Sequence, residues 1–236
     1  MSLYQHFSEV YDLFISDYEW CFEFIKETIQ EYADNPRSLL ELACGTRNIL
    51  QHFIDEYEIS GIDISASMLE QAKKKMPDVP LFEMSMTDFK LDRKFDLILC
   101  MFDSINHLHN YEDWINTFSC VRNHLNPGGV FMFDMNTLER LDRMSQLPGL
   151  MHQKGDAYLN MKVTKTAGNV VNWNVKIFKR VRDNLYELNE DNIEEASFSP
   201  QKVKQDLEML FGKVHIRTYE DGPNIVIGRT FFVCQA

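Results

Sequence analysis

Short apolar segments alternate with helical segments along the first half of the chain, and this rhythm constrains the fold more than any other feature. Five segments have the length and composition of strands: residues 38–44, 58–64, 81–86, 95–102 and 130–134. The fourth, Phe95–Phe102, is apolar at nearly every position, which is typical of a strand buried on both faces. Alternating strands and helices predict a parallel sheet with helices on both sides.

Apolar residues at helical spacings lie before and between these strands. Between the strands we expect helices or helical stretches over residues 45–53, 65–76 and 111–125. The N-terminal part has apolar side chains at mostly helical spacings up to Ile25, and Asn35-Pro36 interrupts the pattern. Residues 1–34 are therefore predicted to form one or two amphipathic helices.

The second half of the chain has a different pattern. Three segments alternate polar and apolar residues, as antiparallel strands do: residues 158–168, 169–181 and 184–198. The turn residues Ala167-Gly168-Asn169 predict a hairpin. Ser199-Pro200 then has the pattern of a helix start, and we expect a helix over Gln201–Phe211. Two final strands are expected over residues 213–219 and 229–234.

These elements predict an α/β fold in one domain, residues 1–236. We expect a Rossmann-like, doubly wound sheet of seven mostly parallel strands. An antiparallel β insertion follows strand five, over roughly residues 150–198. A chain of 236 residues is long enough to bury a full core in this arrangement.

Charge and cysteine content narrow the class of partner. The formal net charge is -12, so binding to a nucleic-acid backbone or to an anionic membrane is not expected. The N-terminus lacks the pattern of a signal peptide, and no apolar stretch is long enough to span a membrane. Five scattered cysteines without a CxxC pair indicate free thiols in a cytoplasmic protein. The histidines are spaced unlike a metal site, and none is expected.

The end of the first strand and the end of the second indicate a ligand site. Ala43 and Gly45 allow a tight turn in which the backbone can approach a ligand closely. Asp63 ends the second strand, where a carboxylate can accept hydrogen bonds from both hydroxyls of a ribose. The pair predicts a cofactor that contains a nucleoside. A dinucleotide is disfavoured, because residues 46–50 lack the further glycines that cradle a pyrophosphate.

Four segments in this order resemble the motifs of class I S-adenosylmethionine-dependent methyltransferases. They are LLELACGTRN, ISGIDISASMLEQAKKK, FDLILCMFDSINHL and LNPGGVFMFDMNT. The segments YQHFSEVYD and SFSPQKVKQDLEMLF resemble parts of the small-molecule branch of that family. The resemblance implies S-adenosylmethionine as cofactor and transfer of its methyl group to a small-molecule acceptor by in-line displacement.

The resemblance also implies a set of cofactor residues. Asp63 would hold the ribose, and Ile64 and Met68 would flank the adenine. Glu41 would either bind the loop or contact the cofactor's amino group, and Tyr11 would either close over the cofactor in an N-terminal lid or pack into the sheet. The complete expected set is Tyr11, Glu41, Ala43, Gly45, Asp63, Ile64, Met68, Ser85, Met86 and Met101.

The residues after strand four lie where the acceptor is expected to approach. His107 is the candidate base, and Asp103 is a candidate catalytic or substrate contact, although both have the alternative of being ordinary polar loop residues. In the insertion, Trp173 and Phe178 either line an acceptor pocket or cover a small sheet. We expect the insertion to cover the acceptor side.

Two departures from the family pattern motivate an alternative function. Arg47 stands where the family has glycine, which costs about 1 kcal/mol or more if the backbone needs a positive φ. Alternatively, the Arg47 side chain reaches the carboxylate of the cofactor and assists its binding. Ser85 stands where an acidic residue often contacts the adenine. The alternative is a non-catalytic protein that binds S-adenosylmethionine or S-adenosylhomocysteine through a degenerate loop. A dehydrogenase-like enzyme is a third hypothesis. The acceptor's identity and the choice between monomer and homodimer stay open.

Overall fold

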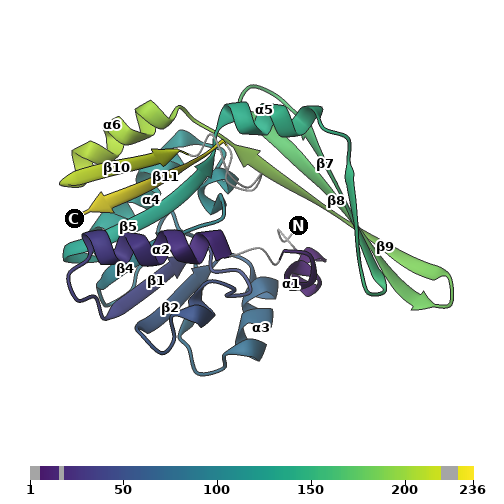
Figure 1. Cartoon of the computed structure of the whole chain (residues 1–236), viewed down its shortest axis with the longest axis horizontal. Helices are drawn as coiled ribbons and strands as arrows, with labels where there is room; N and C mark the ends of the chain where they lie inside the picture. Colours follow the sequence, from purple (N-terminus) through teal and green to yellow (C-terminus); the bar gives the residue numbers. More distant parts are fainter. Residues whose placement is uncertain (1–5, 16–18, 219–227) are drawn as a thin grey trace.

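A computed structural model describes residues 6–15, 19–218 and 228–236 (Figure 1). Its main sheet has the strand order β10-β11-β5-β4-β1-β2-β3. The strands are β1 (Ser38–Leu42), β2 (Glu58–Asp63), β3 (Leu81–Glu83), β4 (Phe95–Cys100), β5 (Leu125–Asn136), β10 (Lys213–Thr218) and β11 (Arg229–Gln235). Strands β1 to β5 are parallel, whereas β11 runs antiparallel to both β5 and β10. The predicted seven-stranded, mostly parallel sheet is confirmed.

Helices bury both faces of this sheet. The helices α2 (Glu19–Tyr32) and α3 (Ala66–Lys75) pack on one face, and α4 (Tyr111–His124) and α6 (Pro200–Leu210) pack on the other. Within β4, Leu97 and Leu99 belong to the first core while Ile98 and Cys100 belong to the second. Because successive side chains of a strand point to opposite faces, a strand covered on both sides has to be apolar throughout.

Side-chain caps fix the predicted helix starts. The Ser65 hydroxyl accepts a hydrogen bond from the Met68 N–H at the start of α3. Ser199 caps α6 in the same way, with Pro200 as the first helical residue. Such caps satisfy N–H groups that have no partner within the helix. The strand β5 starts at Leu125, earlier than predicted, because Leu125 already pairs with Phe95 of β4.

The predicted helical stretch over residues 45–53 is wrong. The chain forms only a turn and one short 3₁₀ segment, η2 (Leu50–His52). Gly45 and Arg47 have φ values of +51° and +72°. This left-handed backbone cannot continue a right-handed helix.

An unpredicted helix, α5 (Leu138–Gln146), follows β5. The Thr137 hydroxyl accepts a hydrogen bond from the Arg140 N–H and caps its start. Leu141 faces inward and packs with Val163 and Val171 of the insertion. The helix thus joins the main sheet to the insertion.

The insertion is an antiparallel sheet with the order β6-β7-β8-β9. Its strands are β6 (Leu150–Lys154), β7 (Ala157–Lys165), β8 (Val170–Arg182) and β9 (Leu185–Ala196). The predicted hairpin turn is present, with Gly168 at a φ of +62° between β7 and β8. In Figure 1 this sheet extends away from the body as a long arm, while its base lies beside α5.

The N-terminal segments lie between the arm and the main sheet. They are η1 (Phe7–Glu9) and α1 (Tyr11–Phe14), followed after an undescribed gap by α2. Phe7 and Val10 pack with Leu159 and Ile177 of the insertion. Leu3 and Tyr18, which belong to the predicted apolar pattern, are outside the described residues. No helix in the described ranges is long and apolar enough to cross a membrane.

Candidate active site

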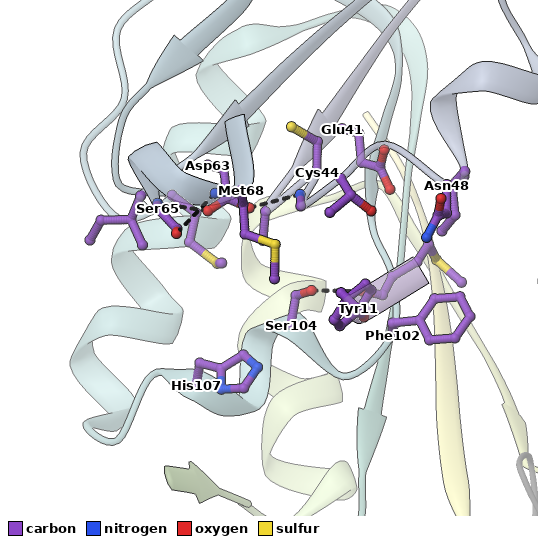
Figure 2. Close-up of a pocket in the computed structure, with 17 residues that line it drawn as sticks. Tyr11, Glu41, Cys44, Asn48, Asp63, Ser65, Met68, Phe102, Ser104 and His107 are labelled. Carbon is purple, nitrogen blue, oxygen red and sulfur yellow. Dashed lines mark hydrogen bonds between the residues drawn. The ribbon is translucent and has the colours of Figure 1, made fainter. Parts of the chain in front are cut away.

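A cavity lies at the carboxyl ends of β1, β2 and β4 (Figure 2). Its lining consists of Tyr11, Glu41, Ala43, Cys44, Gly45, Thr46, Asn48, Ile49, Asp63, Ile64, Ser65, Met68, Met86, Met101, Phe102, Ser104 and His107. Every residue of the expected cofactor set except Ser85 is among them. Ser85 instead shares a hydrogen bond with the Thr87 hydroxyl. We call this space the first cavity.

Asp63 ties the turn after β1 to the end of β2. One carboxylate oxygen accepts a hydrogen bond from the Gly45 N–H at 2.8 Å, and the other accepts one from the Ser65 N–H at 2.8 Å. Burial raises the pKa of Asp63, and these backbone donors oppose the rise. A Cβ atom at Gly45 would meet nothing within 4 Å, so the turn keeps open space above its backbone.

Glu41 lies beneath the same turn and is buried. It accepts a hydrogen bond from the Leu50 N–H, while its Oε2 has no partner among the described residues. Burial raises the pKa of Glu41 well above its ordinary value, and the Arg47 guanidinium opposes this. One oxygen therefore holds the loop, and the other is left with an unused lone pair at the cavity.

Arg47 has a left-handed backbone, with a φ of +72°, but its side chain does not line the cavity. It is fully buried, and its Nη1 donates a hydrogen bond to the Met76 carbonyl at 2.9 Å. The guanidinium therefore neither fills the space above Gly45 nor reaches a ligand bound there. Steric exclusion by Arg47, the main reason to doubt cofactor binding, is absent.

The helix α1 is fastened to the turn by Asp12. Its carboxylate accepts hydrogen bonds from the Thr46 hydroxyl and, at 2.7 Å, from the Asn48 amide, and it pairs with Lys75 at the end of α3. Burial raises the pKa of Asp12, but the hydrogen bonds from its three partners outweigh this effect and lower it overall. The neighbouring Tyr11 is thereby held at the first cavity.

A second, larger cavity adjoins the first. Its volume is about 250 Å³, against about 120 Å³ for the first, and the two share Tyr11, Phe102 and His107. Apolar side chains from α5 and the insertion form much of its wall, and Trp173 is one of them. Phe178, the other aromatic residue predicted for this wall, does not line it.

His107 lies between the two cavities, on the opposite side of the first from Asp63 and Glu41 (Figure 2). Its Nδ1 is 3.3 Å from the Glu194 carbonyl. A carbonyl only accepts, so Nδ1 carries the proton and Nε2 carries the lone pair. Burial lowers the pKa of His107, which favours the neutral, proton-accepting form at pH 7.

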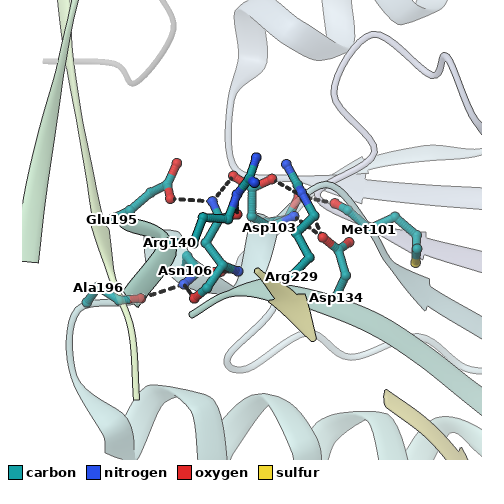
Figure 3. A network of polar contacts seen from close by, with 10 residues as sticks. Met101, Asp103, Asn106, Asp134, Arg140, Glu195, Ala196 and Arg229 are labelled. Atoms are coloured by element: carbon teal, nitrogen blue, oxygen red, sulfur yellow. Dashed lines mark hydrogen bonds and ion pairs between the residues drawn. The ribbon is translucent and has the colours of Figure 1, made fainter. Parts of the chain in front are cut away.

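A buried polar network forms the floor of the second cavity (Figure 3). Arg229 Nη1 lies 2.5 Å from a carboxylate oxygen of Asp103 and 2.5 Å from one of Asp134. Asp103 is thus placed in the second cavity and not in the first. The backbone of Asp103 has a φ of +50°, and this left-handed turn directly after β4 directs its side chain to the network.

Asn136 connects the other residues of this polar network. Its amide donates to Asp103 at 3.0 Å and to Glu195 at 2.9 Å, and its oxygen accepts from Arg140 Nε at 2.8 Å. Glu195, Arg140 and Arg229 were missed by the sequence analysis. One signal for Arg229 existed, because a charged residue directly precedes the apolar run 230–234. Asn106 has a structural role, donating to the Asn136 and Ala196 carbonyls.

Comparison with known proteins shows a likeness to methyltransferases. Residues 39–129 match the family model described as a methyltransferase domain. The solved structure of DesVI from Streptomyces venezuelae superposes with a TM-score of 0.83 and 25% identity, over 97% of each chain. The chain is similar to class I S-adenosylmethionine-dependent methyltransferases, and the match to their domain lies in residues 39–129. The cofactor of these methyltransferases is S-adenosylmethionine.

Two further relatives show the extent of the likeness. The dTDP-3-amino-3,4,6-trideoxy-alpha-D-glucopyranose N,N-dimethyltransferase of Streptomyces venezuelae is 35% identical over 132 residues, 54% of this chain and 56% of that protein. The match therefore spans about half of that relative. The S-adenosylmethionine-bound CalS10, an amino pentose methyltransferase from Micromonospora echinaspora, has the same fold, with a TM-score of 0.80 and 19% identity over 98% of this chain and 96% of that one.

Proposed function

We propose that this protein transfers a methyl group from S-adenosylmethionine to an amino group of a small molecule. The observation that carries the proposal is the pair of adjoining cavities that share Tyr11, Phe102 and His107. The first has the features of a nucleoside site, and the second is large enough for an acceptor. The N,N-dimethyltransferase of Streptomyces venezuelae acts, by its name, on an amino sugar, which supports nitrogen as the methylated atom.

The residues of the first cavity fit the cofactor. The open space above Gly45 admits close approach of a ligand to the backbone. Asp63 keeps lone pairs for ribose hydroxyls after accepting its backbone hydrogen bonds. The unpartnered Oε2 of Glu41 suits the ammonium of an amino-acid end. We assign the adenine to the apolar side chains Ile64 and Met68, with Met86 and Met101 nearby.

When bound, the cofactor supplies a methyl group on a positively charged sulfur. The protein's part is to align the acceptor and to exclude water, and good alignment contributes up to about 7–11 kcal/mol in ideal cases. His107 lines both cavities, and we assign to it the proton that the amine must lose. Such a base typically contributes about 100-fold or more.

The N-terminal segment and the insertion complete the enclosure. The Asp12 contacts fasten α1 beside the first cavity, which supports a lid formed by η1 and α1, whereas α2 packs on the main sheet. Residues of the insertion wall the second cavity, which supports a cover on the acceptor side. All five cysteines are free thiols, as suits an enzyme of the reducing cytoplasm.

Calorimetry with S-adenosylmethionine and S-adenosylhomocysteine tests the proposal directly. We expect both to bind, and we expect labelled methyl transfer from S-adenosylmethionine to a mixture of small amines. The His107→Gln variant should bind the cofactor normally and transfer the methyl group more slowly. Absence of binding of either compound at millimolar concentration would refute the proposed function.

A further inference from the structure

The polar network at the floor of the second cavity contains more acidic than basic groups, although one carboxyl, Asp134, lies beneath the lining residues. Three carboxyl side chains, Asp103, Asp134 and Glu195, meet two guanidinium groups, Arg140 and Arg229 (Figure 3). All five side chains are almost completely buried. Buried charges require partners, so the balance of signs at this floor determines which ligand charge it accepts.

Both guanidinium groups are already engaged. Arg229 contacts Asp103 and Asp134 at 2.5 Å each. Arg140 donates from Nε to the Asn136 oxygen and lies in the field of Asp103 and Glu195. Among the described residues that line this cavity, Arg140 and Arg229 are the only permanent cations. A phosphate would have to take these groups from their present partners and would also meet the carboxyls of Asp103 and Glu195.

Glu195 takes part in neither of the ion pairs of Arg229. It accepts a hydrogen bond from the Asn136 amide at 2.9 Å and shares another with Asp103. Two carboxyls in contact hold a proton between them, because both cannot be ionised at this distance. Burial, followed by the Asp103 charge, raises the pKa of Glu195 well above its ordinary value. An arriving ammonium can displace that proton to solvent and leave the floor electrically balanced.

The apolar walls of the second cavity indicate the character of the rest of the ligand. They are formed largely by apolar side chains of α5, the segment after it and the insertion, among them Met144, Leu147, Leu150, Met161, Val163 and Trp173. An apolar wall above an acidic floor suits a molecule with an apolar body and one cationic end.

We propose that the acceptor is a small amphipathic amine that binds as its ammonium form, without a phosphate or nucleotide, and that the Asp103–Glu195 carboxyl pair anchors it. This inference rests on the proposed function and specifies its substrate class. It separates this methyltransferase from the Streptomyces venezuelae relative, whose named substrate is a dTDP-linked sugar.

Calorimetry with three probes tests the inference on protein saturated with S-adenosylhomocysteine. The probes are 2-phenylethylamine, 2-phenylethanol, which has a hydroxyl in place of the ammonium, and dTDP. We expect the amine to bind about tenfold or more tightly than the alcohol, since a buried charged pair is at stake. We expect no binding of dTDP at millimolar concentration.

Variants test whether the Glu195 carboxyl is the group that binds the ammonium. Glu195→Gln should weaken binding of the amine about tenfold or more and leave the alcohol unchanged. Glu194→Gln is the matched control, because the neighbouring side chain is exposed and pairs with His109. If Glu195→Gln does not fold, as judged by lost S-adenosylhomocysteine binding, Asp103→Asn replaces it with the same expectations.

Three outcomes would overturn the inference: dTDP binding more tightly than the amine, the alcohol binding as well as the amine, or equal loss of both probes in a folded Glu195→Gln. If the wild type fails to bind S-adenosylhomocysteine, the proposed function itself is refuted. If it binds that compound but not the amine, only the substrate class is wrong.

Discussion

Replacing Asp63 with asparagine should weaken cofactor binding far more than it alters the fold. In the native protein the carboxylate accepts one hydrogen bond from Gly45 and one from Ser65. Asparagine has a single oxygen, so one of these N–H groups would face another donor. A hydrogen bond to a charged group contributes about 1.5–3 kcal/mol. We expect a loss of stability of about 2 kcal/mol, which corresponds to a Tm lower by about 4–8 °C for a chain of this size.

The ligand should lose a further contact of the same kind. If the ribose hydroxyls donate to Asp63, the loss of one charge-assisted hydrogen bond raises the Kd for S-adenosylhomocysteine about 10- to 150-fold. Calorimetry on both proteins measures this. Pairing adenosine with 2′-deoxyadenosine gives a double-mutant cycle, in which the wild type should prefer adenosine and Asp63→Asn should lose most of that preference.

The cycle separates binding from stability. Asp142→Asn serves as the control. The Asp142 carboxylate, on α5, pairs with Lys165 of the insertion, and both lie outside the lining of the first cavity. Suppose Asp63→Asn lowers Tm as expected but keeps both the Kd and the preference for adenosine. Asp63 would then only brace the turn, and the assignment of the ribose to it would be wrong.

Three further results are expected. Gly45→Ala should lower Tm by about 2–4 °C because Gly45 has a positive φ. It should also weaken S-adenosylhomocysteine binding, because the new Cβ enters open space at the cavity. Unchanged binding by calorimetry would place the ligand elsewhere. Asp12→Asn should raise the dissociation rate of S-adenosylhomocysteine in stopped-flow experiments by about 3- to 10-fold. The factor is modest because the ion pair between Asp12 and Lys75 is partly exposed. The same rate as in wild type would argue against a lid. An NMR titration of His107 should give a midpoint below 6.5, because burial lowers its pKa. Methyl-transfer activity should fall toward acidic pH with the same midpoint, as His107 loses its neutral form. A midpoint above 6.5 would contradict its role as a base.

The sheet could be predicted because a strand buried on both faces has apolar side chains at nearly every position. The run Phe95–Phe102 is apolar because helices cover both sides of β4. The ends of the strands were predictable for a related reason. In a parallel sheet, residues that follow successive strands meet at one edge, and Gly45 and Asp63 do meet there.

The destination of the Arg47 side chain could not be predicted. The glycine of the family pattern raised the question of a positive φ at this position, and the structure has one. Whether the guanidinium enters the cavity or turns beneath the loop depends on the space behind the turn and on the carbonyl of Met76, which lies far along the chain. No local pattern contains that information.

The floor of the second cavity was missed for a similar reason. Asp103 follows a motif strand, but Arg140, Glu195 and Arg229 come from α5, β9 and β11 and meet only in the folded protein. The helix α5 itself was overlooked, although Thr137 before an amphipathic stretch is a recognisable start signal. The roles assigned to individual site residues remain predictions until the variants above are measured.

The path of the chain through the two cavities has an evolutionary consequence. The helix α5 and the insertion lie between β5 and α6 in the sequence, so most of the wall of the second cavity is encoded by one continuous stretch. The turn and carboxylates at the first cavity come from residues that precede this stretch. If the proposed function holds, sequence changes within residues 137–198 alter the acceptor while the first cavity is inherited unchanged, and a chimaera that exchanges only that stretch should accept a different substrate.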